Sequence, residues 1–246
     1  MEAFVKLIQK RCIHTCKVNL SNKMPSNLKG KSASSQRWLT RQLQDPYVEK
    51  ARQENYRCRS AFKLIEINDR FQIFKPGQIV VDCGAAPGSW TQVAVKKTNS
   101  DGKINNELIG KVFAIDRLPI HHIDGATILG NHDFTKKTSQ KELAKLLDGS
   151  LVDVVLSDMA PNATGVRSMD HELIINLAYA ALKFAIQVST INATLIVKLW
   201  DGGEAQQFEK DTAKFYKTIK IVRPGATRDE STEKFILARG FNGIQR

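Results

Sequence analysis

The stretch DCGAAPGSW, residues 82–90, follows an apolar run and precedes a stretch with helical periodicity. A glycine-rich turn between a strand and a helix lets a ligand lie close to the backbone. A dinucleotide fingerprint needs GxGxxG, but Gly84 and Gly88 are four residues apart with Pro87 between them. A phosphate loop needs GxxxxGK followed by Ser or Thr, which is also absent. A nicotinamide-dependent dehydrogenase is therefore disfavoured.

Short apolar runs alternate with helical patterns from about residue 78 onward. This alternation predicts an α/β fold with a mostly parallel sheet covered on both faces. The segment between the last two predicted strands is too short for a helical crossover, so these strands should pair as an antiparallel hairpin. Residues 56–71 predict a basic amphipathic helix before the sheet. The seven predicted strands are QIVVDC, KVFAID, ATILG, LVDVVLSD, ATLIVKLW, KIVRP and EKFILARGF.

Acidic residues follow three of the predicted strands. Asp116 ends the second strand, Asp133 follows the third and Asp158 ends the fourth. In open α/β sheets these carboxyl ends form the ligand-binding edge, where a carboxylate can accept hydrogen bonds from ribose hydroxyls. Each aspartate alone would equally suit a helix N-cap or a turn. Their common edge is what indicates a site.

Lys198 interrupts ATLIVKLW, a run that is otherwise typical of a strand buried on both faces. A buried lysine is costly unless it is paired. Two explanations fit the sequence. Either Lys198 ends the strand and reaches water, or its amine lies at the carboxyl edge of the sheet beside Asp158.

Four motifs together resemble a known family. DCGAAPGSW, SDMAPNATG, VKLW and RSAFKL are similar, in residues and in order, to motifs of the FtsJ-like RNA ribose 2′-O-methyltransferases, and the resemblance covers about residues 37–241. It is strongest to the mitochondrial branch, which methylates a uridine of large-subunit ribosomal RNA. The resemblance implies a Rossmann-like, seven-stranded methyltransferase fold, S-adenosylmethionine as cofactor, and large-subunit rRNA or the assembling mitochondrial large ribosomal subunit as partner.

The resemblance also carries over site residues. The family's catalytic tetrad falls on Lys63, Asp158, Lys198 and Glu233. Its cofactor site falls on Gly84, Pro87, Gly88, Ser89, Trp90, Asp116, Asp133, Phe134 and Asp158. The chain departs from the family at Ser89, where Gly or Ala is usual, and at Lys234-Phe235, where Val-Tyr is typical. Neither departure removes a functional group.

The tetrad roles follow from the demands of the reaction. A ribose 2′-hydroxyl is a weak nucleophile, so it must be aligned with the sulfonium methyl and must lose its proton as the new bond forms. We expect Lys198 to be the base or the hydroxyl-orienting group, with Asp158 and Glu233 fixing its position. Lys63 would supply a second positive charge and position the ribose.

Two further predictions concern residues near the reacting centre. In the family, the aromatic ring at position 90 lies at the cofactor, but a tryptophan at the start of a helix equally suits the core. Pro161 and Asn162 are expected to shape a loop over the reacting centre, although both are ordinary turn residues.

The first 35 residues contain seven Lys or Arg and a single acid, Glu2. An amphipathic start with a Ser- and Lys-rich continuation is typical of a mitochondrial transit peptide, and a disordered basic arm is the alternative. Residues 36–246 would then form the methyltransferase domain, with a basic helical extension at its start, in the mitochondrial matrix. Removing residues 1–35 takes away seven positive charges and one negative, which lowers the net charge from +12 to +6.

Composition narrows the function classes further. No apolar run approaches the ~20 residues of a membrane span. The four cysteines form no CxxC pair and the five histidines show no metal-ligand spacing, so free thiols and no bound metal are expected.

Basic residues before the sheet predict a track for RNA phosphates, with a solvated surface as the alternative. They are Arg37, Arg41, Lys50, Arg52, Arg57, Arg59 and Lys63. Two other functions remain open. A messenger-cap ribose methyltransferase shares the tetrad, but no aromatic pair for a methylguanine is evident. A non-catalytic, rRNA-binding ribosome-assembly factor is the other, and the intact tetrad favours catalysis.

Overall fold

The computed structural model describes residue 30, residues 32–162 and residues 164–243. The predicted transit peptide lies outside these residues except for its last few positions. The chain divides into two compact units, Met1–Glu49 and Lys50–Arg246. The basic helical extension consists of α1 (Ala33–Gln44) and α2 (Pro46–Gln53). Ser32 caps α1 by accepting a hydrogen bond from the Ser35 amide, and a proline begins α2, where its missing N–H costs nothing.

The second unit is built on one seven-stranded sheet with the strand order β3-β2-β1-β4-β5-β7-β6. The strands of its parallel part are short and apolar, and most of their residues are buried, as expected for a sheet covered on both faces. They are β1 (Ile79–Cys83), β2 (Lys111–Ile115), β3 (Ala126–Leu129), β4 (Val152–Ser157) and β5 (Ser189–Trp200).

The predicted C-terminal hairpin is confirmed. β6 (Tyr216–Val222) and β7 (Glu233–Phe241) pair antiparallel, with Tyr216 opposite Phe241. β7 also inserts between β6 and β5 and runs antiparallel to β5. As a result Glu233, the first residue of β7, lies opposite Trp200 at the carboxyl end of β5.

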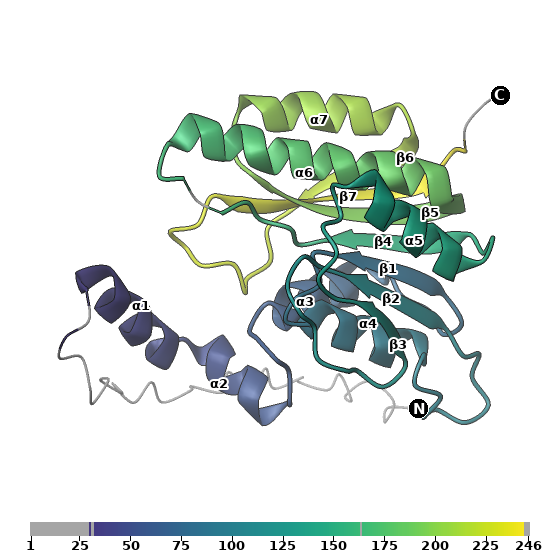
Figure 1. Cartoon of the computed structure of the whole chain (residues 1–246), viewed down its shortest axis with the longest axis horizontal. Coiled ribbons are helices and arrows are strands. Elements are labelled where there is room, and N and C mark those ends of the chain that lie inside the picture. Colours follow the sequence, from purple (N-terminus) through teal and green to yellow (C-terminus); the bar gives the residue numbers. More distant parts are fainter. Residues whose placement is uncertain (1–29, 31, 163, 244–246) are drawn as a thin grey trace, which may run out of the picture. The chain divides into compact units, whose positions relative to one another are not determined.

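Helices cover the two faces of the sheet, as Figure 1 shows. α3 (Ala61–Phe71) and α4 (Ser89–Thr98) pack on one face, where Leu64 and Val93 meet Val80. α5 (Lys137–Leu147), α6 (Arg167–Val188) and α7 (Gly203–Ala213) pack on the other. Because side chains alternate along a strand, the even-numbered Asp82 shares the α3–α4 face with Val80.

Two predicted boundaries are wrong. The helix expected over residues 56–71 begins only at Ala61, because the Arg57 amide donates to Oε1 of Gln92 instead of entering a helix. Residues 56–60 therefore form a segment of bends and turns that leads into α3. The last strand but one begins at Tyr216, four residues earlier than KIVRP, since α7 already ends at Ala213.

Candidate active site

Lys198 is paired at the carboxyl edge of the sheet. β4 and β5 are parallel with Ser157 opposite Val197, which places Asp158 beside Lys198. Lys198 Nζ donates to the backbone oxygen of Asp158 at 2.6 Å and lies 2.8 Å from its Oδ1. Lys198 is only 8% exposed. Its amine therefore lies beside Asp158, as the second explanation predicts, and does not reach water.

Asp158 holds Lys198 through its carboxylate as well as through its carbonyl. Its Oδ1 is buried and lies 2.8 Å from Lys198 Nζ, so the two charges compensate each other away from water.

Lys63 and Glu233 form a second ion pair. Lys63 lies in the first turn of α3, and its Nζ is 2.6 Å from Oε1 of Glu233. Thr227, in the loop between β6 and β7, donates its hydroxyl to the same oxygen at 3.3 Å. The sequence hypothesis had Glu233 fixing Lys198, whereas the structure pairs Glu233 with Lys63.

Phe235 links the two ion pairs. It lies directly opposite Lys198 across β5 and β7, so the two side chains share one face of the sheet. Lys63 Nζ lies 5.8 Å from the centre of the Phe235 ring. Phe235, on the face covered by α3 and α4, therefore lies next to one lysine of each ion pair.

Two residues at the end of β2 hold the glycine turn in place. The amides of Gly84 and Ala85 both donate to the carbonyl of Ile115, and the Ala86 amide donates to Oδ2 of Asp116 at 2.9 Å. Gly84 has φ +78°, and a Cβ there would lie 2.3 Å from Cγ of Met159. Only glycine fits this position without displacing the loop after β4.

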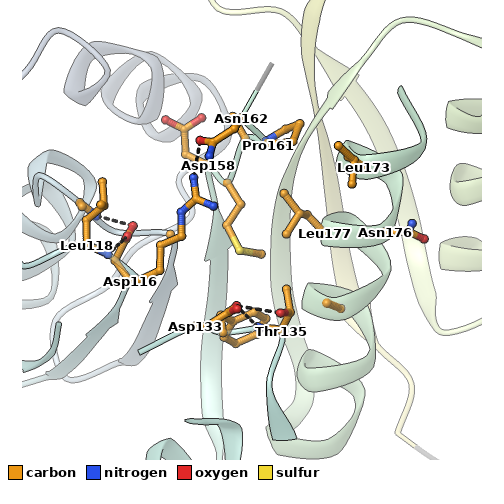
Figure 2. A pocket seen from close by; sticks show the side chains of 17 residues that line it. Asp116, Leu118, Asp133, Thr135, Asp158, Pro161, Asn162, Leu173, Asn176 and Leu177 are labelled. Carbon is orange, nitrogen blue, oxygen red and sulfur yellow. Dashed lines mark hydrogen bonds between the residues drawn. The ribbon is translucent and has the colours of Figure 1, made fainter. Parts of the chain in front are cut away.

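A cavity of about 760 Å³ opens beside the turn. This volume is within the usual range for small-molecule sites. Figure 2 labels three aspartates of the cavity lining: Asp116 and Asp158 directly follow β2 and β4, and Asp133 lies in the loop after β3. Of the predicted cofactor residues, those that line the cavity are Gly84, Asp116, Asp133, Phe134 and Asp158.

Residues of α6 form the opposite wall of the cavity. None of them was predicted as a site residue from the sequence. Leu173 and Leu177 are labelled on this wall in Figure 2, together with Asn176. The residues at positions 173, 176, 177 and 180 line the cavity and follow the i, i+3, i+4, i+7 spacing of one helix face. That spacing was the available signal, but α6 is apolar on several sides.

The loops after β2 and β4 meet at the cavity. Arg117 Nη2 donates to Oδ1 of Asn162 at 2.6 Å, and Pro161 and Leu118 line the cavity beside them. Pro161 and Asn162 thus lie next to Asp158 in the loop where the sequence analysis expected them.

Two of the lining carboxylates are oriented by hydrogen bonds. Asp116 accepts from the Ala86 amide through Oδ2 and from the Leu118 amide through Oδ1. Asp133 Oδ1 accepts from the Thr135 hydroxyl and amide, and these bonds lower the pKa of Asp133. A cavity with three aspartates at its edge suits a ligand that carries hydroxyl groups, amines or positive charge.

Asp82 is a fourth carboxyl group close to this edge. It is fully buried at the end of β1, and its Oδ2 accepts from the Thr91 hydroxyl at 2.7 Å. Burial is the main cause that raises the pKa of Asp82 to about 7; the Thr91 hydroxyl bond opposes this rise, and the negative charges of Asp158 and Asp116 contribute to it. Its Oδ1 has no hydrogen-bond partner among the described residues.

The last residues of the glycine turn, Gly88 to Trp90, are buried, whereas Pro87 is exposed. Trp90 is 2% exposed, its Nε1 donates to the Ser60 carbonyl at 2.8 Å, and its ring packs on Phe235. The Ser89 hydroxyl lies 2.7 Å from that of Ser60. Pro87, Gly88, Ser89 and Trp90 are not among the residues that line the cavity. Of the two positions considered for Trp90, at the cofactor or in the core, the structure shows the core.

The described part of the chain contains no group of three His, Cys, Asp or Glu side chains able to hold a metal ion. Within the same residues, no helix is both long and apolar enough to cross a membrane. Cys58 and Cys83 are free thiols, and Cys12 and Cys16 lie outside the described residues.

Comparison with known proteins gives consistent matches. Residues 56–241 match the FtsJ-like methyltransferase family. The chain is 54% identical over 235 residues to "rRNA methyltransferase 2, mitochondrial" of Drosophila melanogaster, a match covering 95% of this chain and 94% of that protein. It is 43% identical over 217 residues to "Ribosomal RNA large subunit methyltransferase E" of Gluconobacter oxydans, covering 87% of this chain and 75% of that protein.

A solved structure described as a ribosomal RNA methyltransferase of Plasmodium falciparum superposes with a TM-score of 0.67 at 24% identity, covering 77% of this chain and all of that one. This likeness supports the fold alone. The family match spans the whole sheet and all four tetrad positions. The chain therefore belongs to the FtsJ-like methyltransferases and is a methyltransferase of that family.

Proposed function

We propose that the protein methylates the 2′-oxygen of a uridine ribose in mitochondrial large-subunit rRNA, with S-adenosylmethionine as methyl donor. One observation carries the proposal. Asp158 both lines the 760 Å³ cavity and holds Lys198, so the lysine is paired with a residue of the cavity wall. Cofactor cavity and tetrad are thereby joined through one residue.

The residues around the cavity fit S-adenosylmethionine. Asp116 has the position at the end of the second strand that suits ribose hydroxyls, and Asp133 and Phe134 would hold the adenine. Asp158, which is paired with Lys198, adds a third carboxylate to the lining of the cavity. Gly84 lets the ligand approach the backbone. Pro87, Gly88, Ser89 and Trp90 would act by shaping the turn.

S-adenosylmethionine, when bound, supplies a sulfonium methyl group. Lys198 Nζ, fixed by the carbonyl and the carboxylate of Asp158, would orient the ribose hydroxyl toward that methyl. To take the hydroxyl proton as well, Lys198 must first lose a proton and become a neutral amine. The sulfonium methyl would be transferred to the 2′-oxygen, and the hydroxyl proton would pass to the neutral amine of Lys198 or to water. Lys63, held by Glu233, positions the ribose and its neighbouring phosphate.

The substrate is inferred from the relatives. The Drosophila relative is named as a mitochondrial rRNA methyltransferase and the Gluconobacter relative as a large-subunit rRNA methyltransferase. Their agreement supports large-subunit rRNA, free or in the assembling mitochondrial large ribosomal subunit, as partner. The basic N-terminal segment supports import, so residues 1–35 would be a transit peptide and residues 36–246 the matrix enzyme.

Ribose-methylation mapping of mitochondrial large-subunit rRNA tests this function, in cells with and without the protein. We expect one uridine 2′-O-methyl mark to disappear and to return with the wild-type protein but not with Lys198→Ala. An unchanged map would reject the rRNA methylation assignment and leave messenger caps or a non-catalytic assembly role. A mark that is lost while Lys198→Ala still restores subunit assembly would show that binding, not catalysis, is the essential role.

A further inference from the structure

Arg57 fastens two loops that come from different strands. Its Nη1 donates to the Pro87 carbonyl at 2.7 Å and to the His121 carbonyl at 2.9 Å, and its Nη2 donates to the His122 carbonyl at 2.6 Å. Pro87 belongs to the turn after β1. His121 and His122 belong to the segment after β2. One guanidinium thus bridges both.

The surroundings of Arg57 hold its guanidinium in place. Its amide donates to Oε1 of Gln92 on α4, and Nε2 of Gln92 donates back to the Asn55 carbonyl, both at 3.0 Å. Gly88 has φ +111°, and a Cβ there would lie 2.7 Å from Arg57 Nη1. The absent side chain at Gly88 is therefore what lets the guanidinium reach the turn.

The two bridged loops also form one side of the cavity. Ala86, next to Pro87, and Leu118, three residues before His121, both line it. Asp116 ties the same two segments together on the inner side, since it accepts from the Ala86 and Leu118 amides. Arg57 provides a second tie, and the spacing of the loops depends on both.

We propose that Arg57 is a positioning residue for the cofactor cavity, which sets the distance between the glycine turn and the loop after β2, and that it is not a phosphate contact for RNA. The inference rests on the proposed function. Three carbonyl oxygens surround the guanidinium, and satisfying them takes a planar fork of donors that a lysine ammonium cannot reproduce. Because its guanidinium is occupied by these carbonyls, Arg57 would not belong to the predicted track of basic residues for RNA phosphates.

The test uses the full-length protein and three variants. Arg57→Lys keeps the charge but loses the fork, and Arg57→Gln loses both. Arg52→Gln removes an exposed charge from the same basic stretch and is the matched control for cofactor affinity. Calorimetry gives the Kd for S-adenosylmethionine. Filter binding gives the affinity for a large-subunit rRNA fragment at several salt concentrations, and near-ultraviolet circular dichroism reports folding.

We expect both Arg57 variants to raise the cofactor Kd by roughly tenfold, the effect of losing charge-assisted hydrogen bonds, while Arg52→Gln leaves it unchanged. The KM for the cofactor should rise in parallel, with kcat near wild type at saturating cofactor. RNA affinity of Arg57→Lys should equal that of wild type. If Arg57→Gln does not fold, Arg57→Lys carries the comparison.

Three results would overturn the inference. An unchanged cofactor Kd in Arg57→Lys would show that the fork is not needed. A Kd that rises in Arg57→Gln alone would assign the effect to charge. Weaker RNA binding with an unchanged cofactor Kd would make Arg57 a phosphate contact after all. A wild-type protein that binds no S-adenosylmethionine would overturn the proposed function as well, so the two failures are distinguishable.

Discussion

At the scale of single residues, Lys198 carries the chemistry that we propose. Lys198→Met keeps the apolar stem of the side chain and removes the ammonium that Asp158 holds. We expect methyl transfer to fall by roughly a hundredfold to ten-thousandfold, the usual contribution of a positioned acid–base group. The Kd for S-adenosylmethionine should change little. Single-turnover transfer of a labelled methyl group to rRNA measures the first quantity and calorimetry the second.

Lys198→Arg is the control for charge, because it keeps the ion pair with Asp158 but moves the donor atoms. It should fold like the wild type and remain slow. Near wild-type turnover in Lys198→Met would contradict the assignment of Lys198 to the reacting centre.

Asp82 gives the fold a pH dependence. Its pKa is raised from 3.8 to about 7 in the folded state. Between these values the folded protein binds a proton that the unfolded chain does not, so stability falls as pH rises from about 4 to 7 and is constant above that. From pH 5 to pH 8 the wild type should lose roughly 2–3 kcal/mol relative to Asp82→Asn, in which the amide does not titrate.

Urea unfolding of both proteins at pH 5, 6, 7 and 8 measures this difference. Asparagine can still accept the Thr91 hydroxyl bond, so the comparison isolates ionisation. Parallel pH profiles of the two proteins would show that Asp82 does not titrate in this range.

At the scale of elements, the loop between β6 and β7 is anchored to α3. Glu66 Oε2 accepts from the Ala226 amide at 3.0 Å, and the next residue, Thr227, donates to Glu233. Because Ala226 is fully buried, Glu66→Ala leaves its amide without this acceptor, at a cost of about 1–3 kcal/mol. Turnover should fall several-fold as Glu233 loses its support. Urea unfolding and steady-state kinetics measure the two effects.

Glu66→Gln is the matched control, because its amide oxygen can still accept from Ala226. It should retain most of the stability and turnover. Equal behaviour of Glu66→Ala and Glu66→Gln would mean that the anchor does not support Glu233.

Sequence patterns predicted the sheet well because each strand is a short apolar run between clear breakers. The strand ends then predicted the carboxylates at the cavity. The ion pairs between side chains were harder to predict. The local sequence does not show whether Glu233 pairs with Lys63 or with Lys198, because the pairing depends on where β7 inserts into the sheet. Trp90 has the same local sequence in either position, and Ser60 and Phe235, distant in the chain, decide for the core.

The α6 wall shows the same limit for a whole element. A helix with buried residues on several sides gives no sign of which face meets a ligand, because that depends on the loops opposite. The start of α3 was misjudged for a related reason. Basic residues 57 and 59 fit a helical pattern, but their hydrogen bonds go to distant loops.

At the scale of the whole molecule, charge is concentrated in the N-terminal segment. Residues 1–35 carry a net +6 of the total +12, from seven cations and one acid. A membrane potential that is negative inside favours entry of positive charge by about 2.3 kcal/mol per charge per 100 mV. We expect the full chain, tagged at its C-terminus, to fractionate with the mitochondrial matrix and to start at a new N-terminus near the end of this segment.

Two charge variants separate import from simple basicity. Replacing Lys6, Lys10 and Arg11 by Gln removes three charges from the amphipathic start, where a transit signal is read, and should leave the protein in the cytosol. Replacing Lys23, Lys29 and Lys31 removes three charges from the Ser-rich continuation and should disturb import less. Equal effects of the two triple variants would mean that total charge, not the amphipathic start, directs the protein. A cytosolic wild type would reject the transit peptide, and with it the mitochondrial rRNA as substrate.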